Sequence, residues 1–283
     1  MTNEAQKAFW NGDTGQNWVT HDDLMEAMLQ PIGHAVLDVL SPEPGASALD
    51  IGCGCGHQSL SLAERVGPEG SVTGIDISAP MLALARQLAQ ADATPRGAVS
   101  FLEADAQEHG FAEASFDCAF SRFGVMFFED PYAAFSNIHR AMKGGARLGF
   151  CCWQPRAVNP FMTVPARAAM ELLPPPPEMP PRSPGPFAFE EAEYIEDILS
   201  SAGFQHIDVS PMTVPLVFGR GLGLREIVEN LVDIGPIAQM VREAPPALHE
   251  PVRDKVLAAL APFYTERSGM TLEGQFWVVT ASA

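Results

Sequence analysis

Two cysteines alternate with three glycines in the stretch LDIGCGCGHQ (residues 49–58), which also carries the ionisable side chains of Asp50 and His57. Closely spaced thiols can bind a metal or form disulfides, whereas closely spaced glycines let the backbone approach a bound cofactor. The chain has five cysteines, an odd number, with no CxxC pair and no histidine cluster at zinc spacing. We therefore expect no metal site and no disulfide framework, which suits a reducing compartment.

The glycines of this stretch are Gly52, Gly54 and Gly56, and they lie between a predicted strand and a predicted helix. A dinucleotide loop needs Gly-x-Gly-x-x-Gly, but His57 occupies the position of its third glycine. The carboxylate of Asp50 would also repel the pyrophosphate of NAD. A cofactor whose nearby atoms are an amino group and a sulfonium would accept that carboxylate, so the spacing argues against a nicotinamide-dependent oxidoreductase.

Two further carboxylates end predicted strands. Asp76 ends SVTGIDI (71–77) and Asp105 ends AVSFLEAD (98–105). A carboxylate in the position of Asp76 can accept hydrogen bonds from both hydroxyls of a ribose. Since open α/β sheets bind ligands at the carboxyl edge of their strands, both side chains are predicted to face a ligand.

Strands alternate with helices through the first half of the chain, which predicts an α/β fold with a parallel sheet covered on both faces. The pattern breaks after the strand 146–153, because 154–187 contains PPPP and further prolines, and we expect it to be irregular rather than helix or strand. Regular elements then return. They are predicted as a helix (189–202), a strand (204–210), amphipathic helices (223–265) and a last strand (275–281).

Composition excludes several classes of partner. The chain has 283 residues with 17 Lys+Arg against 35 Asp+Glu, a formal charge of −18. Nucleic-acid binding normally needs a basic face, so we expect no nucleic-acid partner and favour a small molecule. No apolar run is long enough for a membrane span, and the polar N-terminus does not resemble a signal peptide. These features predict a cytoplasmic protein without a membrane partner.

Taken together, the motifs LDIGCGCG, VTGIDIS followed by PML, EADA, SFDCAFSRFGVMFF and MKGGARLGF resemble the class I S-adenosylmethionine-dependent methyltransferases that act on small molecules, such as ubiquinone- and sarcosine-type enzymes. The resemblance covers about residues 45–153. It implies a Rossmann-like seven-stranded mixed sheet with an antiparallel last strand beside the sixth, and S-adenosylmethionine as the cofactor. The regions expected on this basis are an N-terminal helical arm (1–44), the cofactor-binding core (45–153), a Pro-rich insertion (154–187), the continuation of the core (188–218), a helical insertion (219–270) and the last core strand (271–283).

The resemblance also implies roles for individual residues. The three glycines would lie under the methionine part of the cofactor, and Asp76 would bind the ribose. Ile77 would contact the adenine face, with Asp105 and Ala106 on the adenine edge and Ser121 beside the methionine end. Met81 belongs to the motif after the second strand and is included with the cofactor-binding residues. Asp50 would contact the cofactor or organise the loop, and Cys53 and Cys55 would be small packed side chains, which disfavours an arsenite methyltransferase.

Catalytic residues are less evident. A general base is needed only if the acceptor carries a proton that must leave. His21 and His57 are the candidates for that base, and Arg122 is a candidate for binding a carboxylate of the acceptor. Each has a structural alternative: His21 as a surface residue at a helix start, His57 as an organiser of the first helical turn, and Arg122 as the partner of an acidic side chain. Trp18 is expected either to cover the methionine end or to anchor the core. Phe161, Met162 and Phe187 are expected either to line an acceptor site in the insertions or to be ordinary packing residues.

The sequence therefore predicts methyl transfer to oxygen or nitrogen, with carbon as a further alternative, of a small organic acceptor. A protein that binds S-adenosylmethionine without catalysis stays the alternative, since an intact glycine loop fits both. The two insertions favour the enzyme, because they are large enough to enclose an acceptor. Both a monomer and a homodimer are compatible with the sequence.

Overall fold

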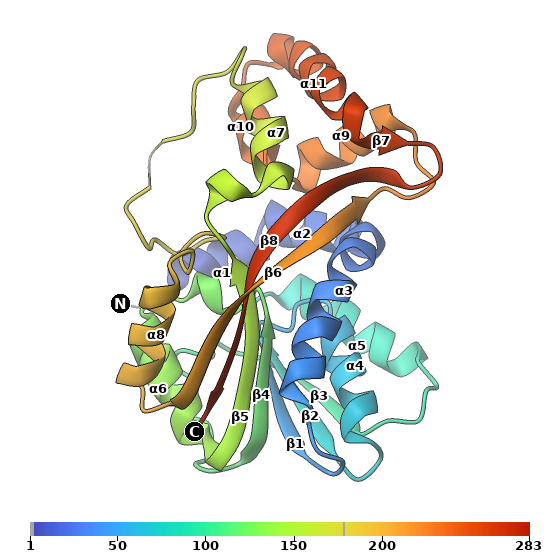
Figure 1. Ribbon diagram of the computed structural model, residues 1–283. Helices are drawn as coiled ribbons and strands as arrows, with labels where there is room; N and C mark the ends of the chain where they lie inside the picture. The colour runs from blue at the N-terminus through green and yellow to red at the C-terminus, as the bar shows by residue number, and fades with distance from the viewer. Residues whose placement is uncertain (1–2, 178) are drawn as a thin grey trace.

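A single mixed sheet organises the protein, and the computed structural model describes residues 3–177 and 179–283 (Figure 1). Five parallel strands are followed by β8, which is antiparallel to both of its neighbours, β5 and β6. A two-residue strand, β7 (Tyr264–Thr265), pairs with β8 outside this path. The predicted seven-stranded mixed sheet with an antiparallel last strand is thus confirmed. In spatial order its strands are β3 (Ala98–Glu103), β2 (Ser71–Asp76), β1 (Ser47–Ile51), β4 (Phe116–Arg122), β5 (Met142–Trp153), β8 (Gly269–Ser282) and β6 (Gln205–Phe218).

Helices cover both faces of the sheet (Figure 1). One face carries α3 (Asp22–Leu40), α4 (His57–Val66) and α5 (Ala79–Ala91), and the other carries α6 (Pro131–Ala141) and α8 (Ala192–Ser201). α3 buries Ile32, Val36 and Leu40, which recur at helical spacing and face the strands. The start of α6 is set locally, because Pro131 needs no N–H donor there and the side chain of Asp130 accepts from the N–H of Ala133.

A second layer of helices lies beyond the carboxyl ends of the parallel strands (Figure 1). The N-terminal arm supplies α1 (Glu4–Asn11) and α2 (Asp13–Thr20). The long strands β6 and β8 extend out of the sheet into this layer, where the two insertions pack on them. The insertions form α7 (Pro160–Ala169), α9 (Leu224–Ile234), α10 (Ala238–Glu243) and α11 (Pro246–Leu260). Short 3-10 turns occur after β4, at η1 (Val125–Phe127), and within the insertions, at η2 (Arg156–Val158) and η3 (Ala261–Phe263).

The prediction that 154–187 contains no helix is wrong, because α7 forms within it. Asn159 precedes the helix, and its side chain is hydrogen-bonded on both sides: it accepts from the N–H of Gln275 at 2.7 Å and donates to the carbonyl of Gln154 at 3.1 Å. Phe161, Pro165 and Ala168 form a buried stripe at helical spacing. Burial of this stripe outweighs the cost of a proline inside the helix.

Three strands are longer than predicted, and β6 shows why. The interpretation ended this strand at 210, but it continues to Phe218 and includes Pro211 and Pro215. Proline removes one backbone donor, so it is tolerated only where one side of the strand is unpaired. β6 is the edge strand and pairs with β8 alone, which makes its prolines compatible with pairing. β5 and β8 likewise begin before their predicted starts.

In the parts of the chain that the structure describes, no helix combines the length and the apolar character that crossing a membrane requires.

Candidate functional site

The glycine loop is packed tightly between neighbouring segments. Gly52 has φ of 67°, and a Cβ added to it would lie 2.7 Å from the Cα of Gly124, just after β4. Gly56, with φ of 85°, caps α4, and a Cβ there would lie 2.8 Å from Ala85 of α5. A side chain at either position would be strained and would clash. The loop is therefore shaped by close contacts with the segment after β4 and with α5.

The cysteines of the loop are buried and free, as are the three elsewhere in the chain. Burial raises the pKa of both the Cys53 and the Cys55 thiol, and the negative charges nearby raise these pKa values further. Such thiols remain protonated and unreactive. No group of three histidine, cysteine or acidic side chains within the described residues is arranged to hold a metal ion.

Asp50 is 1% exposed and accepts a hydrogen bond from the hydroxyl of Ser59 at 2.5 Å. Burial raises the pKa of Asp50 to about 7, although the hydrogen bond from Ser59 and the charge of Arg122 oppose this shift and Asp76 adds to it. The hydrogen bond ties the end of β1 to the first turn of α4. Asp50 therefore organises the loop and also faces the cavity described below.

The carboxylate of Asp76 holds the backbone around the loop. One oxygen accepts from the N–H of Gly54 and the other from the N–H of Ser78, each at 2.8 Å. Burial raises the pKa of Asp76, and these backbone hydrogen bonds offset part of the increase. Asp105 is 6% exposed and accepts from the N–H of Gln107 through Oδ1 only. Its Oδ2 has no hydrogen-bond partner among the described residues.

One large cavity of about 1210 Å³ lies between the carboxyl ends of the strands, the arm and the insertions. Most residues singled out from the sequence line it. They are Trp18, Asp50, Gly52, Gly54, Gly56, Asp76, Ile77, Met81, Asp105 and Ala106 from the expected cofactor site, His57 and Arg122 from the catalytic candidates, and Phe161, Met162 and Phe187 from the expected acceptor site.

Two expected residues do not line the cavity. Ser121 is fully buried, and its hydroxyl donates to the carbonyl of Ile51 at 2.7 Å and accepts from the N–H of Gly124 at 3.2 Å. It joins β1 to the tip of β4, which gives it a structural role, and its place beside the methionine end stays a prediction. His21 lies 3.7 Å from the carboxylate of Asp233 in α9, with 14% of its side chain exposed. It therefore joins the arm to an insertion and is neither a cavity residue nor a surface residue.

The other two candidates form ion pairs with α3. Nε2 of His57 lies 2.6 Å from Oδ2 of Asp22. Burial lowers the pKa of His57, but the hydrogen bond to Asp22 and the charges of Glu26 and Asp22 outweigh it, so the pKa is raised. Arg122 lies 2.8 Å from Glu26, as its structural alternative expects. The structural alternative for His57 is that it organises the first turn of its own helix. Its hydrogen bond instead joins α4 to Asp22 of α3.

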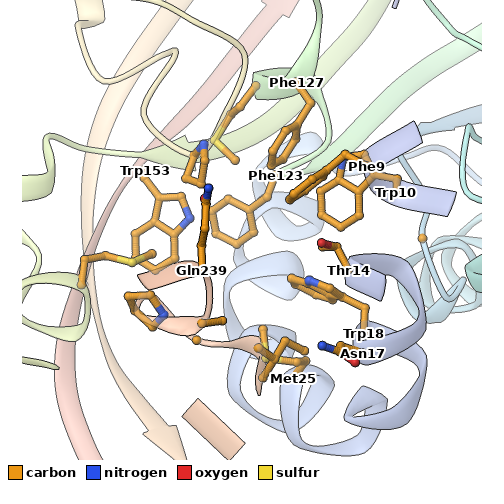
Figure 2. A pocket seen from close by; sticks show the side chains of 18 of the residues that line it. Phe9, Trp10, Thr14, Asn17, Trp18, Met25, Phe123, Phe127, Trp153 and Gln239 are labelled. Atoms are coloured by element: carbon orange, nitrogen blue, oxygen red, sulfur yellow. The ribbon is translucent and has the colours of Figure 1, made fainter. Parts of the chain in front are cut away.

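Sequence reasoning missed most of the aromatic side chains of the cavity. Figure 2 shows Phe9, Trp10, Phe123, Phe127 and Trp153 around it, together with Trp18. Phe123 and Phe127 belong to the stretch SRFGVMFF, whose aromatic residues directly after a strand were a usable signal. Phe9 and Trp10 could not be placed, because nothing in the sequence shows where the arm folds back.

Comparison with known proteins agrees with this geometry. A family model described as "Methyltransferase domain" matches residues 49–150. Aklanonic acid methyltransferase DauC from Streptomyces sp. (strain C5) is 35% identical over 137 residues, which cover 48% of this chain and 60% of that protein. O-methyltransferase cnsE from Penicillium expansum is 31% identical over 211 residues, which cover 72% of this chain and 71% of that protein.

Among solved structures, phosphoethanolamine N-methyltransferase 2 from Haemonchus contortus, in complex with S-adenosyl-L-methionine, has the same fold. Its TM-score is 0.52 at 21% identity, and the match covers 89% of this chain and 52% of that one. The chain spans about half the length of several of the curated relatives it matches, from 42% to 60%. Because the match to cnsE extends over most of both proteins, the chain belongs to the class I S-adenosylmethionine-dependent methyltransferases.

Proposed function

We propose that this protein transfers the methyl group of S-adenosylmethionine to an oxygen or nitrogen atom, or alternatively a carbon atom, of a small organic acceptor. One observation carries the proposal. Asp50, Asp76 and Asp105 come from the ends of three neighbouring strands and line one cavity beside the glycine loop. Buried carboxylates repel phosphates and attract cations, so the site suits a cofactor with a sulfonium and an amino group.

The hydrogen-bonding capacity of these side chains supports the same cofactor. The two carboxylate oxygens of Asp76 accept from the N–H groups of Gly54 and Ser78, and because each oxygen can accept more than one hydrogen bond, they can also accept from the hydroxyls of a ribose. The buried Oδ2 of Asp105, without a partner among the described residues, offers an acceptor for the adenine amino group. Ile77 and Met81 line the cavity beside Asp76, where they would contact the adenine and the ribose, and Ala106 would border the adenine edge.

The methionine end of the cofactor would lie against the three glycines. Arg122 lines this part of the cavity, and its Nη1 is buried without a hydrogen-bond partner among the described residues. This nitrogen is a donor for a carboxylate of the cofactor or of the acceptor. Trp18, from the arm, would cover this end, where it packs edge-on against Trp10 with ring centroids 6.1 Å apart.

When bound, S-adenosylmethionine supplies an activated methyl group, and the residues of the chain position the acceptor and exclude water. If the acceptor carries a proton, His57 can take it. Its Nε2 lies against Asp22, so the imidazole is held in the tautomer with Nδ1 free to accept. Only the deprotonated imidazole can accept this proton, and the pKa of His57 is raised. Proton transfer to His57 is therefore favoured as the pH rises.

The two insertions, 154–187 and 219–270, and the arm would enclose the acceptor. A cavity of about 1210 Å³ exceeds the roughly 300–1,000 Å³ typical of a site for one ligand. A protein that only senses the cofactor needs no space for a second ligand, so the size of the cavity favours the enzyme. Whether the working unit is a monomer or a homodimer does not affect this proposal.

Calorimetry with three ligands tests the cofactor. We expect S-adenosylmethionine and S-adenosylhomocysteine to bind, and NAD not to bind. Asp105→Asn keeps the size of the side chain but removes its charge, and we expect weaker binding of both sulfur compounds by roughly 1.5–3 kcal/mol, the worth of a hydrogen bond to a charged group. Heat on addition of NAD, with none for the sulfur compounds, would overturn the proposal.

A further inference from the structure

Phe123 has a backbone conformation that is unusual for a bulky residue. It follows β4 with φ of 63°, in the left-handed region, and its N–H donates to the carbonyl of Cys151 at 3.2 Å. The next residue, Gly124, is in close contact with Gly52 of the glycine loop. The turn is therefore held from both sides although its conformation is unfavourable, a pattern that clusters at functional sites. Its effect is to present the partly exposed ring of Phe123 to the cavity.

Trp153 packs against this ring. The rings of Phe123 and Trp153 are stacked, with centroids 5.4 Å apart and an interplanar angle of 18°. Phe161, in α7, lies nearly parallel to Trp153, at 9° and 6.4 Å. Phe276, which is fully buried, packs against Trp153 at 4.6 Å. Trp153 and Phe161 are themselves buried, at 6% and 5% exposed, so Phe123 is the ring of this group that is partly open to the cavity. We call Phe123, Trp153 and Phe161 the aromatic platform.

A second group of rings, Phe9, Trp10, Trp18 and Phe127, forms the arm wall of the same cavity. Trp10 packs edge-on against Phe127 at 5.1 Å and against Trp18 at 6.1 Å. In Figure 2, Trp153 lies on the side of the view opposite to Trp18, with Phe123 between them. The other labelled residues are Met25 and three uncharged polar residues, Thr14, Asn17 and Gln239.

The chemistry of these walls selects for planar rings. Aromatic rings attract one another in stacked and edge-on arrangements beyond the effect of buried area. Charged side chains such as Arg122 and Arg156 line other parts of the cavity, but the aromatic rings of these two walls offer no ion pair to a charged group placed between them. The uncharged polar side chains of Thr14, Asn17 and Gln239 can form hydrogen bonds with hydroxyl and carbonyl substituents of a ligand.

Resting on the proposed function, we infer that the methyl acceptor is a planar aromatic compound with uncharged rings and a hydroxyl group, which stacks on Phe123 of the aromatic platform and faces the arm wall. Phe123 and Trp153 determine this specificity. Flat rings bury both faces in such a site, whereas a puckered aliphatic ring system of the same size can contact only part of each wall.

Two probes with the same carbon skeleton test the inference: 2-naphthol, which is planar, and decahydro-2-naphthol, which is not. Hydrophobic burial alone predicts that the saturated compound binds at least as well, since it exposes at least as much apolar surface. Stacking predicts that 2-naphthol binds at least tenfold more tightly. Dissociation constants are measured by calorimetry on the full chain, with S-adenosylhomocysteine present and absent.

Phe123→Leu and Trp153→Leu should each reduce this preference to less than threefold, whereas Trp153→Phe should retain it. Phe263→Leu makes the same change as Phe123→Leu at a residue in η3 that does not line the cavity, and should have no effect. Thermal unfolding shows whether each variant is folded.

Equal affinity for the two probes, no binding of 2-naphthol, or an unchanged preference in the folded leucine variants would overturn the inference. If S-adenosylhomocysteine does not bind, the proposed function is contradicted. The ratio of the two dissociation constants, measured without S-adenosylhomocysteine, still tests whether the aromatic platform selects planar rings.

Discussion

Asp50 should make the protein less stable as the pH rises through neutrality. Its folded-state pKa of about 7 exceeds the ordinary value of 3.8, so the folded protein keeps a proton that the unfolded chain loses between these two values. Stability therefore falls as the pH rises across that window. With about 1.4 kcal/mol for each unit of pKa difference, ionised Asp50 costs the folded state about 4 kcal/mol once the pH exceeds 7.

Asp50→Asn isolates this cost. Asparagine has the same shape, and its carbonyl oxygen can still accept from Ser59, but it never ionises. At pH 5 the wild-type protein already carries about 1–2 kcal/mol of the cost, and at pH 8 nearly all of it. We expect the free energy of unfolding of the variant, relative to wild type, to increase by about 2–3 kcal/mol between pH 5 and pH 8.

Urea unfolding monitored by circular dichroism, at several pH values between 5 and 8, measures this difference. Asp117→Asn is the matched control. A hydrogen bond from Lys143 lowers the pKa of Asp117, so Asp117 is ionised in both states throughout this range and its difference from wild type should stay constant. A difference for Asp50→Asn that does not change with pH would refute the reasoning, and would mean that water or relaxation of the loop solvates Asp50.

Three further predictions concern the cofactor, the thiols and the insertion. Asp76→Ala should weaken binding of S-adenosylmethionine by roughly 2–4 kcal/mol, since each hydrogen bond to a charged group contributes about 1.5–3 kcal/mol; calorimetry giving wild-type affinity would show that Asp76 does not bind the ribose. Cys53→Ala and Cys55→Ala should each leave a folded protein with cofactor affinity and methyl transfer intact, because burial keeps these thiols protonated; loss of transfer with cofactor binding retained would revive a thiol mechanism. Replacing 154–187 with a short linker should abolish methyl transfer and change cofactor affinity by less than about tenfold, roughly 1.4 kcal/mol; a normal rate with the linker would place the acceptor site elsewhere.

The parallel part of the sheet could be predicted from the sequence because its signals are local. β1, β2 and β3 are short runs that stop at or within two residues of a glycine or an aspartate, at Gly52, Asp76 and Asp105. Helices there start or end with a residue of known preference, such as Pro131 in α6. The glycine loop could be predicted for the same reason, since a side chain at Gly52 would collide with Gly124. Asp76 and Asp105 follow from strand ends alone, and the sheet topology then brings them to one edge.

The acceptor side of the cavity could not be predicted, because its walls come from segments that are distant in sequence. The carboxylates of Asp22 and Glu26 recur at helical spacing in α3 and suggest a solvated helix face. In the folded protein they instead meet His57 of α4 and Arg122 of β4. Such pairings depend on how α3 packs across the sheet, which no local pattern records.

Proline misled the prediction for a related reason. Proline disfavours helices and central strands, yet Pro165 lies inside α7 and Pro211 lies within β6. In both cases tertiary structure decides: α7 buries one face against α11 and β8, and β6 is at the edge of the sheet, where a missing N–H need not break a ladder. A proline-rich segment therefore excludes regular structure only where no neighbouring surface is available to bury it. The same neighbouring surface, β8 with the helices packed on it, brings Phe161 against Trp153 and completes the aromatic platform.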